Sequence, residues 1–131
     1  MKKTFTVPHG FSINHVAEFI LNNLTKSKII MLNGDLGAGK TALVKELAKL
    51  IGIEDKITSP TFNYMKDYPG LIHIDAYHLN DDLSEFEDYY QDNLIAIEWS
   101  DNITHSYKNY LDVRISLDKE NNHIFVISEV K

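Results

Sequence analysis

The feature that most constrains this sequence is a short segment, residues 34–41, which reads G-D-L-G-A-G-K-T. It matches the pattern G-x-x-x-x-G-K-[ST] in full, with the apolar run Lys28–Asn33 before it and a helical pattern over Lys40–Leu50 after it. Glycines let the backbone turn tightly and direct its N–H groups at phosphate oxygens, and the following helix adds the positive end of its dipole. The segment therefore predicts a phosphate-binding loop (P-loop).

Each residue of the P-loop and of the following helical turn is a candidate contact for a nucleotide. Lys40 is expected to reach the β- and γ-phosphates, and the Thr41 hydroxyl is expected to bind Mg²⁺. The predicted cofactor-binding residues are Gly34, Asp35, Leu36, Gly37, Ala38, Gly39, Lys40, Thr41 and Ala42.

Two predicted strands end in a carboxylate: Leu71–Ile74 is followed by Asp75, and Leu94–Ile97 by Glu98. Parallel strands in an open sheet present their carboxyl ends to the ligand crevice, so we expect both acids to face the phosphates. One can bind Mg²⁺ while the other orients or deprotonates the attacking water, and the spacing leaves the assignment open. Either acid can instead be a helix cap. The candidate catalytic residues are Lys40, Asp75 and Glu98, and the candidate metal ligands are Thr41 and Glu98.

The remaining pattern predicts an α/β fold, a P-loop NTPase-like mixed sheet with flanking helices, in a single domain over residues 1–131. Alternation over Tyr110–Leu117 and His123–Val130 predicts a C-terminal antiparallel hairpin. Periodicity fails from Ile53 to Gly70, which predicts a long loop with room for a short extended piece. The other predicted elements are a strand at Lys3–Val7, a helix capped by Ser12 and running to about Asn23, and an acidic amphipathic helix at Asp82–Gln91.

Composition limits the compartment and the partners. The chain has no cysteine, which excludes disulfides and thiolate metal sites and favours a reducing, cytoplasmic setting. Its apolar runs are far shorter than the ~20 residues of a membrane span, and no signal peptide is expected. With 13 basic and 19 acidic residues, the net charge of −6 is unlike that of a domain that grips a nucleic-acid backbone by itself. We therefore expect no DNA binding and no membrane partner.

The scarcity of arginine narrows the reaction. Arg114 is the only one, whereas small-molecule kinases clamp phosphates with several guanidinium groups. The guanine-reading segment N-K-x-D is absent, which disfavours a GTPase switch. These features favour a small ATPase that is slow alone and receives a positive charge from a partner, an effect of ~10³–10⁵ in rate. Two alternatives stay open: a nucleotide-dependent assembly switch with incidental hydrolysis, and a small-metabolite kinase.

Four segments together resemble the TsaE family: the P-loop, S-P-T-F at 59–62, H-I-D-A-Y at 73–77 and I-E-W at 97–99. That family is the bacterial ATPase component of the machinery that makes threonylcarbamoyladenosine at position 37 of tRNA. The resemblance implies ATP and Mg²⁺ as cofactors and partners similar to TsaB and TsaD. It also implies that the chain supports the transferase pair, and that tRNA is reached only through the complex.

The resemblance also suggests roles for individual residues. It implies that Glu98 is the Mg²⁺-associated acid and Asp75 the second acid. It implies a switch-like loop near the γ-phosphate, although these residues can instead form a local hydroxyl-bonded turn; the switch loop consists of Thr58, Ser59, Pro60 and Thr61. Two positions depart from the family pattern: His78 stands where an arginine is frequent, and Val16 where a threonine is frequent near the adenine.

Two further side chains have alternative interpretations. Trp99 follows Glu98, so on a strand the two would point to opposite faces. Trp99 then either shapes the site or a partner surface, or packs against the sheet. His73 shares a strand face with Asp75. We expect it to pack in the core or to support the site from behind rather than to bind a metal.

Overall fold

The computed structural model describes residues 1–35, 37–60 and 64–131, which form a seven-stranded mixed sheet in the order β1-β7-β6-β2-β5-β4-β3. The elements along the described chain are β1 (Lys2–Val7), α1 (Asn14–Asn22), β2 (Ile29–Asn33), α2 (Lys40–Leu50), β3 (Met65–Tyr68), β4 (Leu71–Asp75), the 3₁₀ helix η1 (Ser84–Tyr89), β5 (Leu94–Glu98), the 3₁₀ turn η2 (Ser100–Asn102), β6 (Tyr110–Leu117) and β7 (His123–Val130).

The centre of the sheet is parallel and completely buried. Strand β2 pairs in parallel with β5 and β6, and β5 pairs in parallel with β4. Every residue of β2, β4 and β5 is buried, as expected of parallel strands that are covered on both faces. Their carboxyl ends therefore lie side by side, and β2 leads directly into the P-loop.

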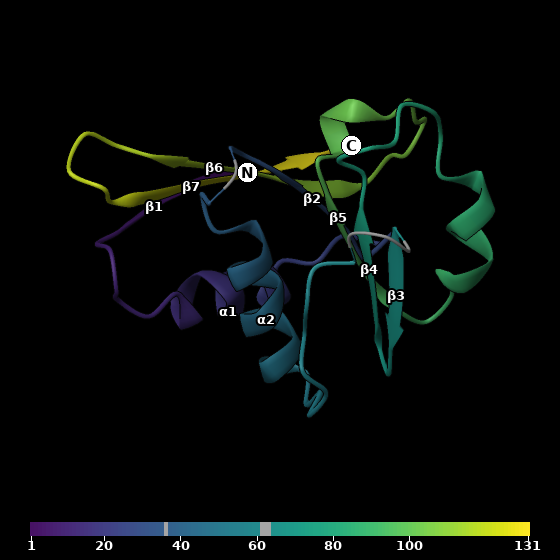
Figure 1. Ribbon diagram of the computed structural model, residues 1–131, viewed down its shortest axis with the longest axis horizontal. Coiled ribbons are helices and arrows are strands. Elements are labelled where there is room, and N and C mark those ends of the chain that lie inside the picture. The colour runs from purple at the N-terminus through teal and green to yellow at the C-terminus, as the bar shows by residue number, and fades with distance from the viewer. Residues whose placement is uncertain (36, 61–63) are drawn as a thin grey trace.

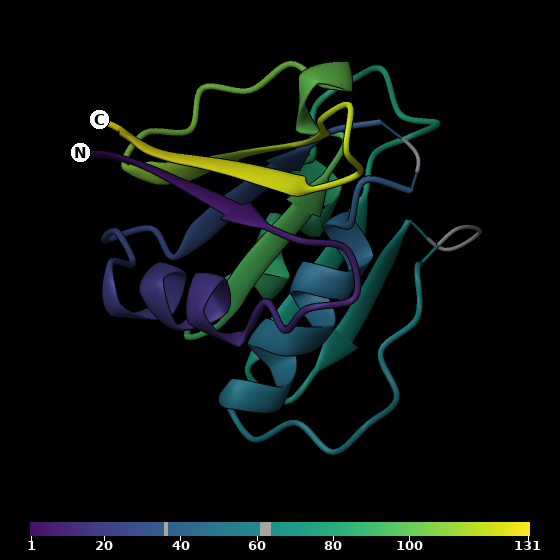
Figure 2. The ribbon, with the colours of Figure 1, turned by 90° about the vertical axis from the view of Figure 1, so that its left-hand side faces the viewer.

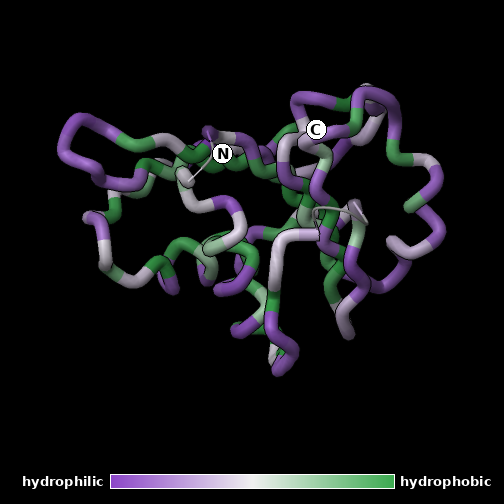
Figure 3. Tube along the Cα trace, viewed as in Figure 1, coloured by the Kyte–Doolittle hydropathy of each residue, from purple (hydrophilic) through white to green (hydrophobic). Residues whose placement is uncertain are grey.

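Two apolar layers enclose this centre. Helices α1 and α2 lie together on one face (Figure 1), where Ile20 and Leu47 pack against Leu32 of β2. On the other face of the sheet, Leu83 and Phe86 form an apolar cluster with the isoleucines that β4 and β5 direct to that face. Figure 3 shows apolar strands through the middle of the molecule and polar segments at its margins.

The antiparallel strands flank the parallel centre. Strand β1 pairs with β7, and β7 pairs with β6, which confirms the predicted hairpin and its bounds. The two termini consequently lie next to each other (Figure 2), and the backbone N–H of Glu129 donates to the carbonyl of Met1. The start of β7, at His123, reaches the P-loop.

Most predicted elements are confirmed, and α2 and β4 have the predicted bounds. Strand β3 is the short extended piece within the predicted long loop, of which residues 61–63 lie outside the described part. Helix α1 begins later than predicted. Ser12 Oγ accepts the N–H of Asn14 at 3.1 Å, but the helix cap is Ile13.

The prediction of an amphipathic helix over Asp82–Gln91 is wrong in kind, because the segment forms a 3₁₀ helix over Ser84–Tyr89 only. Asp82 Oδ1 accepts both the N–H and the hydroxyl of Ser84, at 3.1 and 2.7 Å, which starts a tight local turn. Leu83 and Phe86 both reach the core at a spacing of three residues, which suits a 3₁₀ repeat. The like charges of the segment also weaken a regular α-helix.

Candidate active site

Two glycines shape the P-loop. A Cβ on Gly34 would lie 2.3 Å from the carbonyl oxygen of Ile115 on β6, so the chain can pass this strand only as glycine. Gly39 has a φ of 118°, in the left-handed region that favours glycine, and is the cap residue of α2. Helix α2 therefore begins at Lys40, and its first-turn N–H groups have no partner within the helix. Such a helix start favours an anion.

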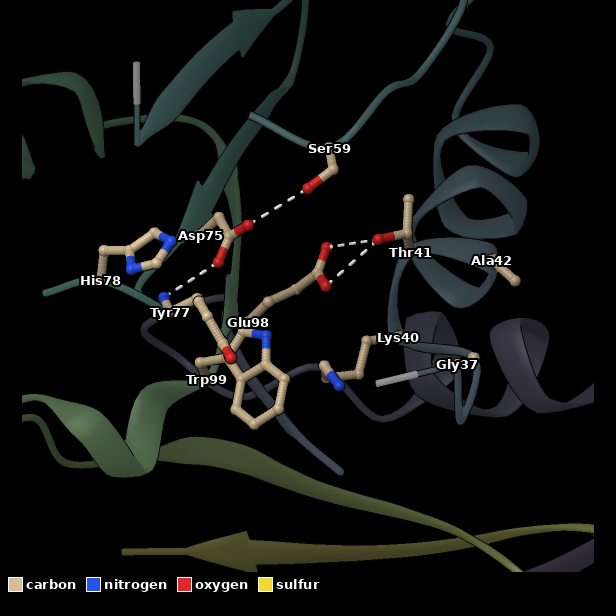
Figure 4. A pocket seen from close by; sticks show the side chains of 11 residues that line it. Gly37, Lys40, Thr41, Ala42, Ser59, Asp75, Tyr77, His78, Glu98 and Trp99 are labelled. Atoms are coloured by element: carbon tan, nitrogen blue, oxygen red, sulfur yellow. Dashed lines mark hydrogen bonds between the residues drawn. The ribbon is translucent and has the colours of Figure 1, made fainter. Parts of the chain in front are cut away.

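A cavity of about 500 Å³ opens beside the start of α2. Its walls come from the P-loop, the switch loop and the carboxyl ends of β4 and β5. The volume is in the range of small-molecule sites, ~300–1,000 Å³. The lining residues are Gly37, Gly39, Lys40, Thr41, Ala42, Ser59, Asp75, Tyr77, His78, Glu98 and Trp99. The structure thus brings all three candidate catalytic residues to one cavity (Figure 4).

Thr41 and Glu98 contact each other across the cavity. Thr41 Oγ1 lies 3.0 Å from Glu98 Oε2 and 3.2 Å from Oε1, so the hydroxyl donates to the carboxylate. Glu98 is buried at the end of β5, and Thr41 lies in the first turn of α2. The two predicted metal ligands therefore present their oxygens at the same point of the cavity.

Lys40 is held inside its own loop. Its ammonium donates to the carbonyls of Gly34 and Asp35, the latter at 3.0 Å, and lies 4.0 Å from the centre of the Trp99 ring. Burial lowers the pKa of Lys40 from its ordinary value, while the negative charge of Glu98 opposes this most strongly, followed by Asp35 and Asp75. A polyphosphate at this position would supply further negative charge to the ammonium.

Asp75 has different neighbours from Glu98. Its Oδ2 accepts the hydroxyl of Ser59 at 3.1 Å, and its Oδ1 accepts the backbone N–H of Tyr77 at 3.0 Å. The backbone N–H of Asp75 donates to the carbonyl of Tyr64. Asp75 therefore joins the end of β4 to the switch loop, on the side of the cavity away from the Thr41–Glu98 contact (Figure 4).

The switch loop contributes one described side chain to the cavity, that of Ser59. Thr58 Oγ1 instead accepts a hydrogen bond of 2.5 Å from Lys66 on β3. Pro60 is buried, and its carbonyl accepts the N–H of Tyr64. Thr61 lies outside the described residues, as does Leu36 of the P-loop.

The expectation that Trp99 and Glu98 point to opposite faces is wrong. Strand β5 ends at Glu98, and Trp99 has a φ of 61°, which breaks the alternation of the strand. The indole consequently lines the same cavity as Glu98 and packs edge-on against Tyr77, with ring centres 4.8 Å apart. Trp99 therefore lines the cavity and also packs against the apolar cluster of β4 and β5, so both interpretations of this side chain hold.

Two histidines contact the site, one from the H-I-D-A-Y segment and one from outside the predicted motifs. His73 is fully buried, and its Nε2 lies 2.6 Å from Glu98 Oε2, so it supports the site from behind. His123 Nδ1 donates to the carbonyl of Ala38 in the P-loop at 2.8 Å, across 85 residues of sequence. Sequence reasoning missed His123, because no local pattern indicates that β7 begins beside the P-loop.

Arg114 is not one of the described residues that line this cavity. Its guanidinium pairs with both carboxylate oxygens of Asp101 in η2, and its Nε donates to Asp112 at 3.1 Å. These two carboxylates raise the pKa of Arg114, and the hydrogen bonds that the guanidinium donates to Asp101 contribute most. The only arginine of the chain is therefore engaged by two carboxylates, and it lines a second cavity together with Gly34 and Asp35 of the P-loop.

Neither a cluster of metal ligands nor a membrane helix is present in the described part of the chain. No group of three or more His, Cys, Asp or Glu side chains there is arranged to hold a metal ion. None of its helices combines the length and apolarity needed to cross a bilayer.

Comparisons with known proteins relate this chain to one family. A family model described as "Threonylcarbamoyl adenosine biosynthesis protein TsaE" matches residues 8–125. Among curated proteins named tRNA threonylcarbamoyladenosine biosynthesis protein TsaE, that of Nostoc is 36% identical over 132 residues, covering 92% of this chain and 81% of the relative. That of Streptomyces coelicolor is 38% identical over 89 residues, which span 60% of each chain.

One solved structure is similar over the whole fold. YdiB of Bacillus subtilis has a TM-score of 0.77 with this chain, at 19% sequence identity, and the match covers 100% of this chain and 87% of YdiB. This similarity confirms the predicted α/β, P-loop NTPase-like fold with its mixed sheet.

Proposed function

This chain belongs to the TsaE family, and we propose that it is the ATP-binding and ATP-hydrolysing component of tRNA threonylcarbamoyladenosine biosynthesis. It acts in the cytoplasm together with a transferase pair of the TsaB and TsaD kind. Its resemblance to the TsaE family implies that it supports this pair through ATP hydrolysis and does not itself carry out the transfer.

The observation that carries this function is the contact between Thr41 and Glu98 beside Lys40. Thr41 Oγ1 lies 3.0 and 3.2 Å from the two carboxylate oxygens of Glu98. Hydroxyl and carboxylate oxygens are the hard ligands that Mg²⁺ prefers, and Mg²⁺ in nucleotide enzymes needs only one or two of them besides phosphates and waters. The residues present therefore fit Mg²⁺ together with a polyphosphate.

The different neighbours of the two carboxylates support different roles. Glu98 contacts the P-loop hydroxyl of Thr41, so we assign it to the metal side. Asp75 contacts Ser59 and the backbone of Tyr77, so we assign it to orienting the attacking water. When bound, Mg²⁺ neutralises charge that develops on the phosphates. The chain contributes Lys40 as the cation on the phosphates and Asp75 as the acceptor facing the water.

We expect the isolated chain to hydrolyse ATP slowly. Lys40 is the cation that lines the described cavity, and Arg114 is engaged by Asp101 and Asp112. A positive charge supplied by a partner is worth ~10³–10⁵ in rate in other phosphoryl-transfer systems. The net charge of −6 supports contact with tRNA through the transferase complex rather than directly.

The decisive experiment measures phosphate release from ATP by the purified chain, with and without TsaB-like and TsaD-like proteins from the same source. A slow, Mg²⁺-dependent rate that rises at least tenfold with the partners is expected. Rapid turnover by the chain alone would contradict the need for a partner. The absence of turnover in both conditions would contradict the ATPase assignment.

Two variants separate hydrolysis from a nucleotide-dependent assembly switch. Lys40→Ala should lose ATP binding, whereas Glu98→Gln should bind ATP and fail to hydrolyse it. If Glu98→Gln still supports tRNA modification over many cycles, the chain acts as a switch and hydrolysis is incidental. Loss of modification with retained binding supports the ATPase.

A further inference from the structure

His73 is a fully buried polar residue directly behind the site. Its exposed fraction is 0%, and it lies opposite Ala96 in the register of β4 with β5. It shares a sheet face with Leu71 and Ala96, which belong to the apolar layer beneath α1 and α2. Its Nε2 lies 2.6 Å from Glu98 Oε2. Since a carboxylate accepts, Nε2 carries the hydrogen and donates.

We propose that His73 is a positioning residue that fixes the Glu98 carboxylate for Mg²⁺ binding and thereby sets the Mg²⁺ requirement of hydrolysis. This inference rests on the proposed function. It concerns a side chain that itself contacts neither nucleotide nor metal.

Two side-chain donors hold the carboxylate of Glu98. Among the described residues, the side chains that donate to its carboxylate are those of Thr41 and His73. The Thr41 hydroxyl is also the P-loop ligand for Mg²⁺, so it cannot hold Glu98 and serve the metal equally. The hydrogen bond from His73 reaches Glu98 from the buried interior of the sheet, so it persists when the Thr41 hydroxyl turns to the metal. It anchors Oε2, and the other carboxylate oxygen, Oε1, contacts only the Thr41 hydroxyl among the described side chains.

A histidine at this buried position lowers the stability of the core. A buried polar ring is unfavourable unless it is hydrogen-bonded, and His73 Nδ1 has no partner among the described residues. An apolar side chain would fill the same space without an unpaired nitrogen. The position therefore gives up some core stability for one hydrogen bond, and that bond ends on Glu98. Such local departures from the best core are typical of functional sites.

The geometry of the amide side chains supplies a matched pair of variants. In His73→Gln, the amide nitrogen stands at the same number of bonds from Cα as the histidine Nε2, so the donor is kept. In His73→Asn, the amide ends one atom earlier, at the level of Nδ1, so the bond to Glu98 is lost while a polar side chain of similar size remains. Ile72→Val, on the opposite face of β4, controls for a general loss of core packing.

The experiment measures kcat, the KM for ATP and the Mg²⁺ concentration for half-maximal hydrolysis, with the partner proteins present. His73→Asn should lower kcat about 10–100-fold and raise the Mg²⁺ requirement, as changes behind metal ligands do elsewhere. A fluorescent ATP analogue in excess EDTA should bind wild type and variant equally. His73→Gln should keep most of the activity, and Ile72→Val should keep the wild-type Mg²⁺ requirement.

Several outcomes would overturn the inference. A folded His73→Asn variant with wild-type kcat and Mg²⁺ requirement would do so, as would equal losses in His73→Asn and His73→Gln. If His73→Asn does not fold, His73→Leu takes its place, since it lacks a donor and suits an apolar layer. No Mg²⁺-dependent hydrolysis by the wild-type chain would overturn the proposed function together with this inference. If the wild-type chain hydrolyses ATP normally and the variant without a donor at residue 73 keeps the wild-type kcat and Mg²⁺ requirement, only the inference about His73 is overturned.

Discussion

The ammonium of Lys40 lies over the indole ring of Trp99, 4.0 Å from its centre. The same ammonium donates to two carbonyls of its own loop, so it is held by neutral oxygens and by an aromatic face. Phosphate oxygens form stronger, charge-assisted bonds with an ammonium than carbonyls do. A bound polyphosphate is therefore expected to draw Lys40 away from these partners and to change the surroundings of the indole.

Trp99 should consequently report nucleotide binding. It is the only tryptophan of the chain, so its emission can be measured without labelling. Titration with ATP and Mg²⁺ should give a saturable change in tryptophan emission in the wild type and none in Lys40→Ala. An identical change in Lys40→Ala would show that the signal does not depend on the lysine–indole contact.

Gly34→Ala should abolish nucleotide binding. The added methyl would lie 2.3 Å from the Ile115 carbonyl oxygen, so the P-loop must shift away from β6. Overpacking of this kind costs about 1–3 kcal/mol of the free energy of unfolding, measured by urea denaturation. Gly52→Ala is the control, since Gly52 has a positive φ of 90°, which strains an alanine, but an added Cβ there meets open space. It should be destabilised by a similar amount and still bind ATP; loss of binding in both variants would contradict the prediction.

Arg114→Met should leave catalysis largely intact. The guanidinium is half-exposed and pairs with Asp101, so its loss should lower the free energy of unfolding by at most about 1 kcal/mol. Hydrolysis with the partner proteins present should stay within about threefold of wild type, far from the ~10³–10⁵ loss expected for a catalytic arginine. A loss of that size would identify Arg114 as the phosphate-facing arginine.

Alkaline pH should destabilise the fold through Tyr90, which directly follows η1, and Tyr107, whose hydroxyl lies 3.1 Å from that of Tyr90. Burial raises the pKa of Tyr90 from 10.0 to about 12, and burial together with the hydrogen bond to Glu87 raises that of Tyr107. The unfolded chain therefore releases these protons first, so the stability they contribute is complete below pH 10 and is lost as pH rises through about 12. Tyrosinate absorbance and circular dichroism should show ionisation coupled to unfolding, less steeply in Tyr90→Phe. Ionisation of Tyr90 and Tyr107 near pH 10 in a chain that stays folded would contradict this prediction.

The parallel centre of the fold could be predicted from sequence because β2, β4 and β5 are short, mostly apolar segments. Leu71–Asp75 and Lys40–Leu50 have the predicted bounds, since burial on both faces and an i, i+3, i+4 pattern are strong local signals. The nature of the segment after Asp82 could not be predicted in this way. A pattern that suits an α-helix also suits a 3₁₀ helix when the two buried side chains of the segment, Leu83 and Phe86, are three residues apart.

At the site, sequence reasoning located the residues of the motifs and missed what tertiary structure adds. Lys40, Asp75 and Glu98 could be placed at one edge because parallel strands share that edge. The left-handed backbone of Trp99 has no signature in neighbouring residues. The contact of His123 with Ala38 depends on the pairing of β7 with β6, a relationship between distant parts of the chain.

We propose that the P-loop, with Lys40 and Thr41, binds ATP together with Mg²⁺. Titration calorimetry tests it most directly, with ATP added to the wild-type chain in Mg²⁺ or in EDTA, and to Lys40→Ala in Mg²⁺. We predict a saturable heat at one site in the wild type, weaker binding in EDTA and none in Lys40→Ala. No heat from the folded wild-type chain at millimolar ATP and Mg²⁺ would contradict the account, as would equal binding by Lys40→Ala.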